Sequence, residues 1–104
     1  MNRKLLNEEL NRKTPGEYQN SVKSPLVLVL DNIRSQHNIG SAFRTADAFL
    51  VEKIFLCGFT ATPPNNEIHK TALGAETIVP WQHFEYTADA VAHLKNQGYI
   101  VISI

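Results

Sequence analysis

The sequence is nearly without cysteine and has no long apolar run. Cys57 is the only cysteine, so the chain cannot close an intramolecular disulfide. Cysteine and histidine residues nowhere have the spacing of metal ligands, so no metal site is predicted. No segment approaches the roughly 20 apolar residues of a membrane span, and the charged N-terminus lacks the apolar stretch of a signal peptide. These absences predict a cytoplasmic protein in a reducing compartment, with no membrane partner.

The sequence also lacks net charge. Ten lysines and arginines balance ten aspartates and glutamates, so the formal net charge at pH 7 is zero. A domain that binds nucleic acid through bulk electrostatics is usually basic, so zero net charge argues against that mode of binding but not against a local basic patch. The 104 residues fit one domain, and 43% hydrophobic with 19% charged residues is a globular composition.

Residues 1–23 are expected to form an N-terminal helical arm, separate from an α/β domain over residues 24–104. Leu5, Leu6 and Leu10 share one face of a predicted helix over residues 3–13. The arm either packs on the domain as a surface helix or reaches out to a partner.

Apolar runs and helical periodicity alternate through residues 24–104. Buried strands are predicted at residues 25–31, 53–58, 77–79 and 99–104, and helices at residues 39–50, 67–73 and 87–97. Strands that alternate with helices indicate an α/β fold, with a parallel sheet and flanking helices. Ligands of such sheets bind beyond the carboxyl ends of the strands, so the loop after Asp31 is the first candidate site.

The last apolar run continues to Ile104 with no polar tail and no helix to cover it. Chain termini normally lie at the surface, so we expect the sequence to be a fragment of a longer domain. The alternative is a strand that ends at an interface between subunits.

The loop after the first strand carries Arg34 and His37 and leads into a helix at Asn38, whose first turn is expected to contain Gly40 and Ser41. A helix N-terminus with small side chains exposes backbone N–H groups, so this turn is predicted to bind an anion such as a phosphate.

Two arginines add donors to this region, because Arg34 and Arg44 offer planar guanidinium groups to phosphate or ribose oxygens. Purely structural roles compete at each position. Asn38 could be only a helix N-cap, and Gly40 could be small only for close packing. Arg44 could be an exposed helix residue paired with Asp47.

Residues 38–46 (NIGSAFRTA) resemble the first motif of the SpoU/TrmH branch of the SPOUT RNA methyltransferases. Residues 53–58 look like the family's second strand, and residues 70–75 with 79–81 resemble its short helix and third strand. The resemblance covers roughly residues 25–104. It implies the first part of an α/β knot fold, with the knot that binds the methyl donor expected beyond Ile104.

The resemblance also implies an activity, which is methyl transfer from S-adenosyl-L-methionine to a ribose 2′-hydroxyl of transfer or ribosomal RNA by a homodimer. By match to the motif, Arg44 is the catalytic arginine and Asn38 supports the site. Because a guanidinium stays protonated in proteins, Arg44 is a poor base, and we expect it to orient the hydroxyl and stabilise alkoxide charge. Arg34, His37 and Ser41 are the expected RNA contacts.

Two other functions stay open. One is a non-catalytic RNA-binding module that keeps the front of the fold, and the other is a small-molecule-binding α/β domain. The phosphate-binding glycine patterns that favour the second are missing. Because the donor pocket is expected beyond Ile104, the 104-residue chain alone is predicted to be inactive.

Overall fold

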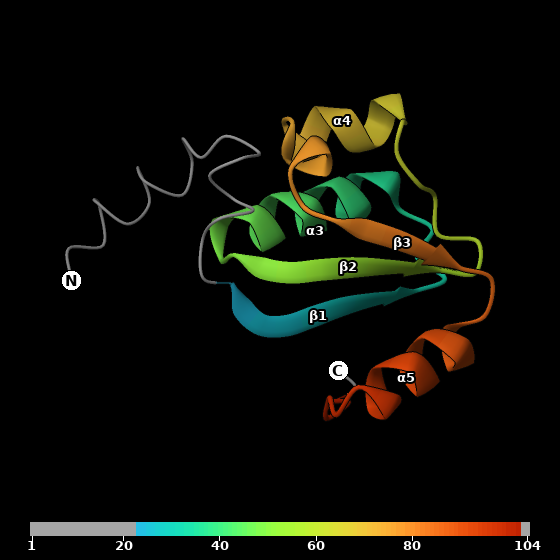
Figure 1. Cartoon of the computed structure of the whole chain (residues 1–104). Coiled ribbons are helices and arrows are strands. Elements are labelled where there is room, and N and C mark those ends of the chain that lie inside the picture. Colours follow the sequence, from blue (N-terminus) through green and yellow to red (C-terminus); the bar gives the residue numbers. More distant parts are fainter. Residues whose placement is uncertain (1–22, 103–104) are drawn as a thin grey trace, which may run out of the picture.

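The computed structural model describes residues 23–102 (Figure 1). The elements follow in the order β1 (Ser24–Asp31), α3 (Gln36–Ala48), β2 (Val51–Cys57), α4 (Asn66–Ala72), the 3₁₀ helix η1 (Ala75–Thr77), β3 (Trp81–Phe84) and α5 (Thr87–Asn96). Apart from Lys23, the helical arm expected over residues 1–23 lies outside the described residues.

The three strands form a parallel sheet in the order β1-β2-β3. Asp31 pairs with Cys57, and Cys57 pairs with Phe84, so the carboxyl ends of all three strands meet at one edge. The expected α/β class, with a parallel sheet and flanking helices, is confirmed. β1 is half-buried rather than buried, because it lies at the side of the sheet and has a neighbouring strand only in β2.

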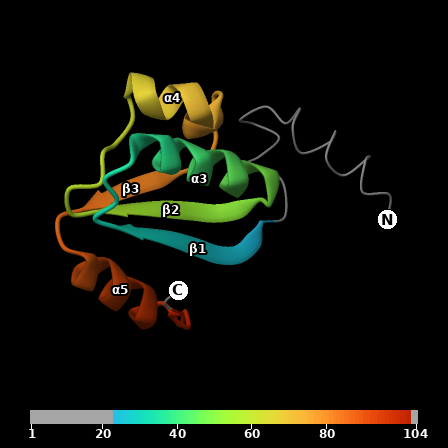
Figure 2. The ribbon, with the colours of Figure 1, turned by 180° about the vertical axis from the view of Figure 1, so that it is seen from behind.

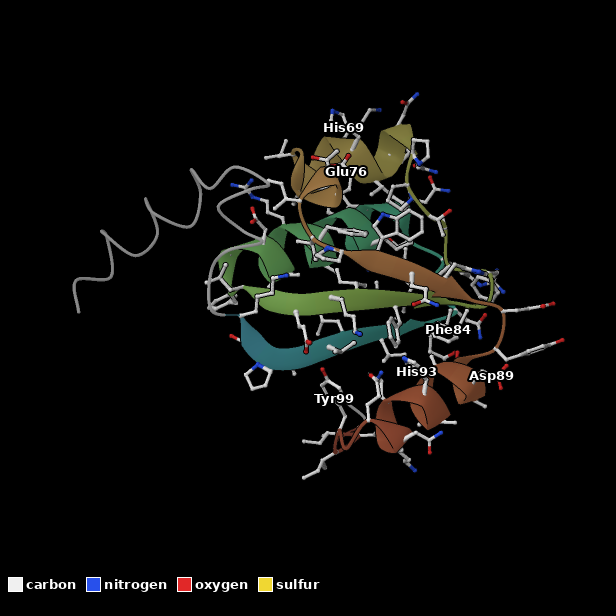
Figure 3. The ribbon with its side chains drawn as sticks, in the orientation of Figure 1. His69, Glu76, Phe84, Asp89, His93 and Tyr99 are labelled. Atoms are coloured by element: carbon white, nitrogen blue, oxygen red, sulfur yellow. The ribbon has the colours of Figure 1, made fainter. Side chains whose placement is uncertain are left out.

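Helices cover both faces of this sheet. Figures 1 and 2 show α3 and α4 on one face and α5 on the other. The central strand β2 alternates between them: Ile54 and Leu56 join the core under α3, while Phe55 and Cys57 join the core over α5. Phe84 packs on Phe55 with ring centroids 4.7 Å apart, and His93 of α5 lies beside it (Figure 3). Burial on both faces explains why β2 reads as an unbroken apolar run.

α3 follows the predicted apolar stripe but begins earlier than expected. Ser35 is its N-cap, with a hydroxyl that accepts a hydrogen bond from the Asn38 backbone N–H at 3.1 Å. The prediction that Asn38 enters the helix is therefore wrong, since the helix begins at Gln36. The helix ends at Ala48, and Phe49, although it continues the apolar spacing of the helix, is 67% exposed.

The strand predicted at residues 77–79 is wrong. The chain there forms η1 and a turn, and the third strand is β3, which starts at Trp81. Val79 is nevertheless 2% exposed, because the turn after η1 inserts it into the core under α3. The apolar run at residues 77–79 therefore resembles a buried strand in sequence, although its side chains reach the core from a turn. Trp81, the first residue of β3, is 37% exposed.

The strand predicted at residues 99–104 is absent from its described part, residues 99–102. Ile100 and Ile102 are 89% and 82% exposed. The Tyr99 backbone N–H donates to the Leu94 carbonyl at 3.0 Å, and the Tyr99 hydroxyl donates to the Glu52 carboxylate. The first bond holds the chain against the end of α5, and the second ties the Tyr99 side chain to β2 without a backbone ladder to that strand. Residues 103–104 lie outside the described part.

Candidate functional site

The candidate site lies at the carboxyl edge of the sheet, where two loops and the start of α3 meet. The loop after β1 spans residues 32–35, and the loop after β2 includes residues 58–60. In a parallel α/β sheet this edge is where ligands bind, because the loops and helix N-termini there are free to vary.

Asn32 joins the two loops. Its Oδ1 accepts a hydrogen bond from the Phe59 backbone N–H at 3.0 Å. Gly58 makes this possible: its φ is +65°, and a Cβ at that position would stand 1.9 Å from the same Oδ1. Only glycine both adopts that backbone conformation easily and leaves room for the amide. The carboxyl ends of β1 and β2 are therefore tied together by a side chain.

Thr60 makes a second link between the loops. It is 2% exposed, and its hydroxyl donates to the Leu30 carbonyl at 3.2 Å while accepting from the Ile33 backbone N–H at 2.9 Å. Both hydrogen-bonding capacities of a buried hydroxyl are thus satisfied. The loops that carry the site are fixed by buried polar contacts. The linking roles of Asn32 and Thr60 were not predictable from the sequence, because no local pattern marks these residues.

Arg34 lies on the first loop and faces the second. Its guanidinium carbon stands 5.3 Å from the centroid of the Phe59 ring. Both residues are exposed, with 58% of Phe59 accessible to solvent. A cation over an aromatic face at such a site contributes about 0.5–1 kcal/mol. Phe59 was missed in the sequence because its contact with Arg34 depends on the pairing of β1 with β2.

The polar face of α3 carries the other predicted residues. His37, Asn38 and Arg44 are exposed and Ser41 is half-buried. Ser41 follows Asn38 by three positions and precedes Arg44 by three, so it neighbours both along the helix. Asn38 and Arg44 themselves lie about 9 Å apart along the axis and about 120° apart around it. They do not contact each other, and only a ligand would bridge them.

Arg44 has an unengaged guanidinium within the described part of the chain. It is exposed and forms no hydrogen bond or ion pair with any residue of 23–102. The alternative role, an ion pair along the helix, is therefore not formed there. A surface arginine without a structural partner contributes little to stability, and its charge is available to a ligand.

Gly40 has a packing role, and the anion-binding turn predicted around it is wrong. The residue lies in the second turn of α3, and a Cβ there would stand 1.8 Å from the Thr71 hydroxyl and 2.5 Å from the Ile68 carbonyl oxygen. α4 thus covers this part of the helix. The Thr71 hydroxyl also donates to the His37 carbonyl at 3.0 Å, which fastens α4 to the first turn of α3.

Asp31 gathers two donors at the same sheet edge. The Thr87 hydroxyl donates to Asp31 Oδ1 at 2.5 Å, and the Asn32 side-chain amide donates to it at 2.9 Å. Thr87 is the first residue of α5, whose N-cap is Tyr86, without a side-chain hydrogen bond. Burial raises the pKa of the neighbouring Cys57 thiol, and the Thr87 hydroxyl opposes this effect. Cys57 is therefore an inert buried residue rather than a nucleophile.

The described edge does not fit S-adenosyl-L-methionine. A pocket for such a ligand needs several converging polar groups that are free to bind it. The Asp31 carboxylate is engaged by Thr87 and Asn32, and the Asn32 and Thr60 side chains bind backbone groups of the loops. The described residues therefore do not offer a pocket for this ligand.

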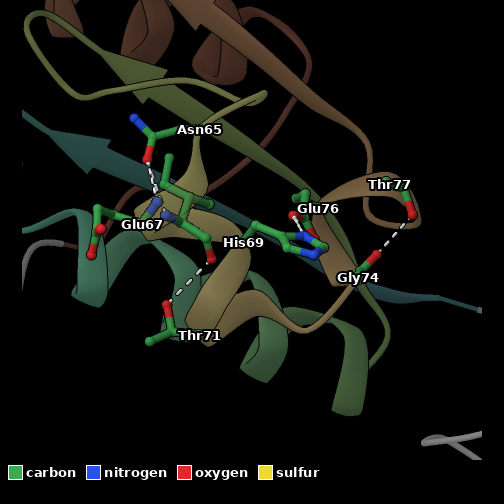
Figure 4. A network of polar contacts seen from close by, with 8 residues as sticks. Asn65, Glu67, His69, Thr71, Gly74, Glu76 and Thr77 are labelled. Atoms are coloured by element: carbon green, nitrogen blue, oxygen red, sulfur yellow. Dashed lines mark hydrogen bonds and ion pairs between the residues drawn. The ribbon is translucent and has the colours of Figure 1, made fainter.

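A second polar cluster lies on α4 and η1 (Figure 4). His69 Nδ1 stands 2.6 Å from Glu76 Oε2, and the Lys70 ammonium is 3.0 Å from the Glu67 carboxylate. His69 and Lys70 are exposed, as predicted for surface polar residues. Glu76 is buried, and its other carboxylate oxygen has no partner among the described residues. The His69–Glu76 contact joins η1 to α4 and lies away from the sheet edge.

Two features are absent from residues 23–102, a membrane-spanning helix and a metal-binding cluster. None of their helices combines the length and the apolarity that crossing a bilayer requires. Nor do they bring together three or more histidine, cysteine, aspartate or glutamate side chains able to hold a metal ion.

Comparison with known proteins identifies the family. Residues 25–104 match the SpoU rRNA Methylase family. A 23S rRNA (guanosine-2′-O-)-methyltransferase RlmB of Vibrio vulnificus is 30% identical over 95 residues, which is 91% of this chain and 38% of that protein. The RlmB of Neisseria meningitidis is 33% identical over 81% of the chain and 34% of its own length.

A relative with a broader name is a putative TrmH family tRNA/rRNA methyltransferase of Staphylococcus saprophyticus, which is 30% identical over 77% of the chain and 32% of its own length. The chain thus spans about a third of the length of the curated relatives it matches. The family match covers most of the chain, including both loops of the sheet edge and the polar face of α3. The chain belongs to the SpoU rRNA Methylase family.

Proposed function

We propose that the chain is the RNA-binding front part of a ribose 2′-O-methyltransferase that acts on transfer or ribosomal RNA. The family membership and the names of the relatives support this proposal. So does the site, because exposed cationic and amide side chains project from α3 and from the loop after β1.

The observation that carries the proposal is the exposed, unengaged guanidinium of Arg44. A 2′-hydroxyl that attacks a methyl group develops negative charge on its oxygen and must lose a proton. Arg44 does not accept that proton, because a guanidinium stays protonated in proteins. Its role is to hold the hydroxyl and an adjacent phosphate by charge-assisted hydrogen bonds and to stabilise the developing alkoxide.

The neighbouring residues position the RNA. Asn38 holds the ribose through its amide, one turn before Ser41 on the same face. His37 and Ser41 contact the RNA backbone along the stripe that ends at Arg44, and Arg34 adds a planar donor from the loop. Because Asn38 and Arg44 do not touch, a sugar-phosphate unit lying along α3 is the natural bridge between them.

The methyl donor of this reaction is S-adenosyl-L-methionine, which supplies an electrophilic methyl group. None of the described residues is assigned to its pocket, which we place beyond Ile104. A homodimer in the cytoplasm is the proposed state of the complete protein.

The proposal is tested by Arg44→Ala in the full-length protein, with transfer of radiolabelled methyl to RNA as the readout. We expect a loss of at least about 100-fold in rate, comparable to removing one group that stabilises an oxyanion. Lys95→Ala, an exposed charge on α5 at the opposite face of the sheet, is the control and should retain full activity.

Circular dichroism should be the same for both variants. If Arg44→Ala keeps wild-type activity, Arg44 is not catalytic. If the wild-type protein binds RNA but transfers no methyl group to any tested RNA, the alternative of a non-catalytic binding module replaces the enzyme.

A further inference from the structure

We propose that Phe59 and Arg34 form a stacking platform for one unpaired nucleobase of the RNA. This inference rests on the proposed function, because it assumes that RNA is the ligand of the sheet edge. It adds a base-binding subsite beside the sugar-phosphate stripe of α3. No feature of the family match assigns Phe59 a role.

The Phe59 ring is exposed to solvent, yet the loop that carries it is fixed. Phe59 leaves 58% of its surface in water, although a phenylalanine ring is among the side chains most favoured in a core. The loop that carries it is nonetheless anchored. Asn32 Oδ1 holds the Phe59 backbone N–H, and the next residue, Thr60, is buried and bonded to the β1 side. An apolar ring held in solvent on a loop that these polar contacts fix is ready to bind a ligand.

The Phe59 ring also has a cationic partner in Arg34. The Arg34 guanidinium carbon lies 5.3 Å from the ring centroid, so a planar cation and an aromatic face lie together in one exposed unit. Nucleobases stack on aromatic rings and on guanidinium planes, and RNA-binding proteins use both to hold bases that have left a helix. A peptide or a lipid has fewer flat groups than RNA that could stack on these two surfaces.

The pair of Arg34 and Phe59 also lies close to the start of α3. Arg34 directly precedes Ser35, the N-cap of α3, and His37 lies in the first turn. A strand of RNA whose backbone follows the polar face of α3 therefore reaches the loop carrying Arg34 at the start of the helix. With zero net charge, the chain lacks the bulk electrostatic attraction of a basic domain, so stacking contributes a larger share of affinity.

The test measures binding of a fluorescent single-stranded RNA oligonucleotide by anisotropy. Phe59→Ala should weaken binding roughly 5- to 150-fold, the range seen when one stacked base loses its aromatic partner. Phe59→Trp should bind at least as well as the wild type, because the ring face is kept. The matched control is Phe49→Ala, which removes a 67% exposed aromatic ring at the opposite end of α3 and should leave affinity unchanged.

An oligonucleotide with one abasic position scanned along its length identifies the stacked base. At one position the wild type should lose the same factor that Phe59→Ala loses, and Phe59→Ala should lose nothing further there. Equal weakening of the variant toward intact and abasic RNA at every position overturns stacking. A Phe59→Ala variant that binds RNA normally but no longer self-associates in sedimentation shows a protein interface instead, and also overturns it.

These outcomes separate the subsite from the proposed function. If the wild type binds RNA and Phe59→Ala binds equally well, the platform is wrong while the methyltransferase proposal stands. If the wild type binds no RNA at all, both are wrong. Circular dichroism of each variant checks that the exposed substitution leaves the fold intact.

Discussion

Replacing Gly40 with alanine tests whether the packing of α4 on α3 supports the site. A Cβ at this position would lie 1.8 Å from the Thr71 hydroxyl oxygen and 2.5 Å from the Ile68 carbonyl oxygen. The first atom belongs to a side chain that can rotate, but the second is backbone. α4 must therefore move away from α3, or α3 must bend.

Two effects of opposite sign compete in Gly40→Ala. In an open helix, alanine stabilises by about 0.5–1 kcal/mol relative to glycine, because it has less conformational entropy to lose. Forcing an extra carbon into a packed contact costs about 1–3 kcal/mol. With a backbone oxygen at 2.5 Å, the upper part of that range applies, so we expect a net destabilisation of about 1–2 kcal/mol.

The assay is thermal unfolding followed by circular dichroism. For a domain of this size, the expected free-energy change lowers Tm by about 4–16 °C. Thr71→Ala removes the nearer clash, so Gly40→Ala should cost less in a Thr71→Ala background than in the wild type. Ser41→Ala, at the half-buried position next to Gly40, controls for helix propensity and should change Tm little. An unchanged or raised Tm for Gly40→Ala would refute the close contact.

Three further predictions concern the buried links and the donor. Thr60→Val leaves the Ile33 N–H and the Leu30 carbonyl without their partner, so urea unfolding should show a loss of about 1–3 kcal/mol; less than 0.5 kcal/mol would contradict the link. Because burial raises the pKa of Cys57, iodoacetamide at pH 8 should label it slowly until urea unfolds the chain, and rapid native labelling would oppose this reading. Calorimetry should detect no saturable binding of S-adenosyl-L-methionine to residues 1–104, and tight binding would show that the donor pocket is complete there.

The raised pKa of Cys57 makes its contribution to folding stability decrease at high pH. Its folded pKa is raised above the ordinary value of 9.0, so the protonated thiol favours the folded state. That contribution is fully present below pH 9.0 and is lost as pH rises through the higher folded pKa. Alkaline unfolding of the wild type should therefore be steeper with pH than that of Cys57→Ala.

Elements with strong periodicity were predictable from the sequence. The apolar stripe of α3 placed Ile39, Phe43 and Ala46 in the core, and all three are fully buried. β2 was predictable because it is covered on both faces. β3 was not, because its four residues are exposed or half-buried and carry no apolar pattern. Short exposed strands of this kind are defined by pairing with a neighbour rather than by their own sequence.

The candidate site was predictable only along the chain. Asn38, Ser41 and Arg44 follow one another at intervals of three residues, so the spacing of the motif sufficed to place them on successive turns of α3. The contact between Arg34 and Phe59 joins two loops, and it exists because β1 pairs with β2 in a particular register. The role of Gly40 was open for the same reason, since the atoms that exclude a side chain there belong to α4.

The most direct test of the account is nucleoside mass spectrometry of RNA treated with the full-length protein and S-adenosyl-L-methionine. The account predicts a 2′-O-methylated ribonucleoside with the wild type and none with Arg44→Ala. A methyl group on a base, or an undiminished 2′-O-methyl product with Arg44→Ala, would contradict it.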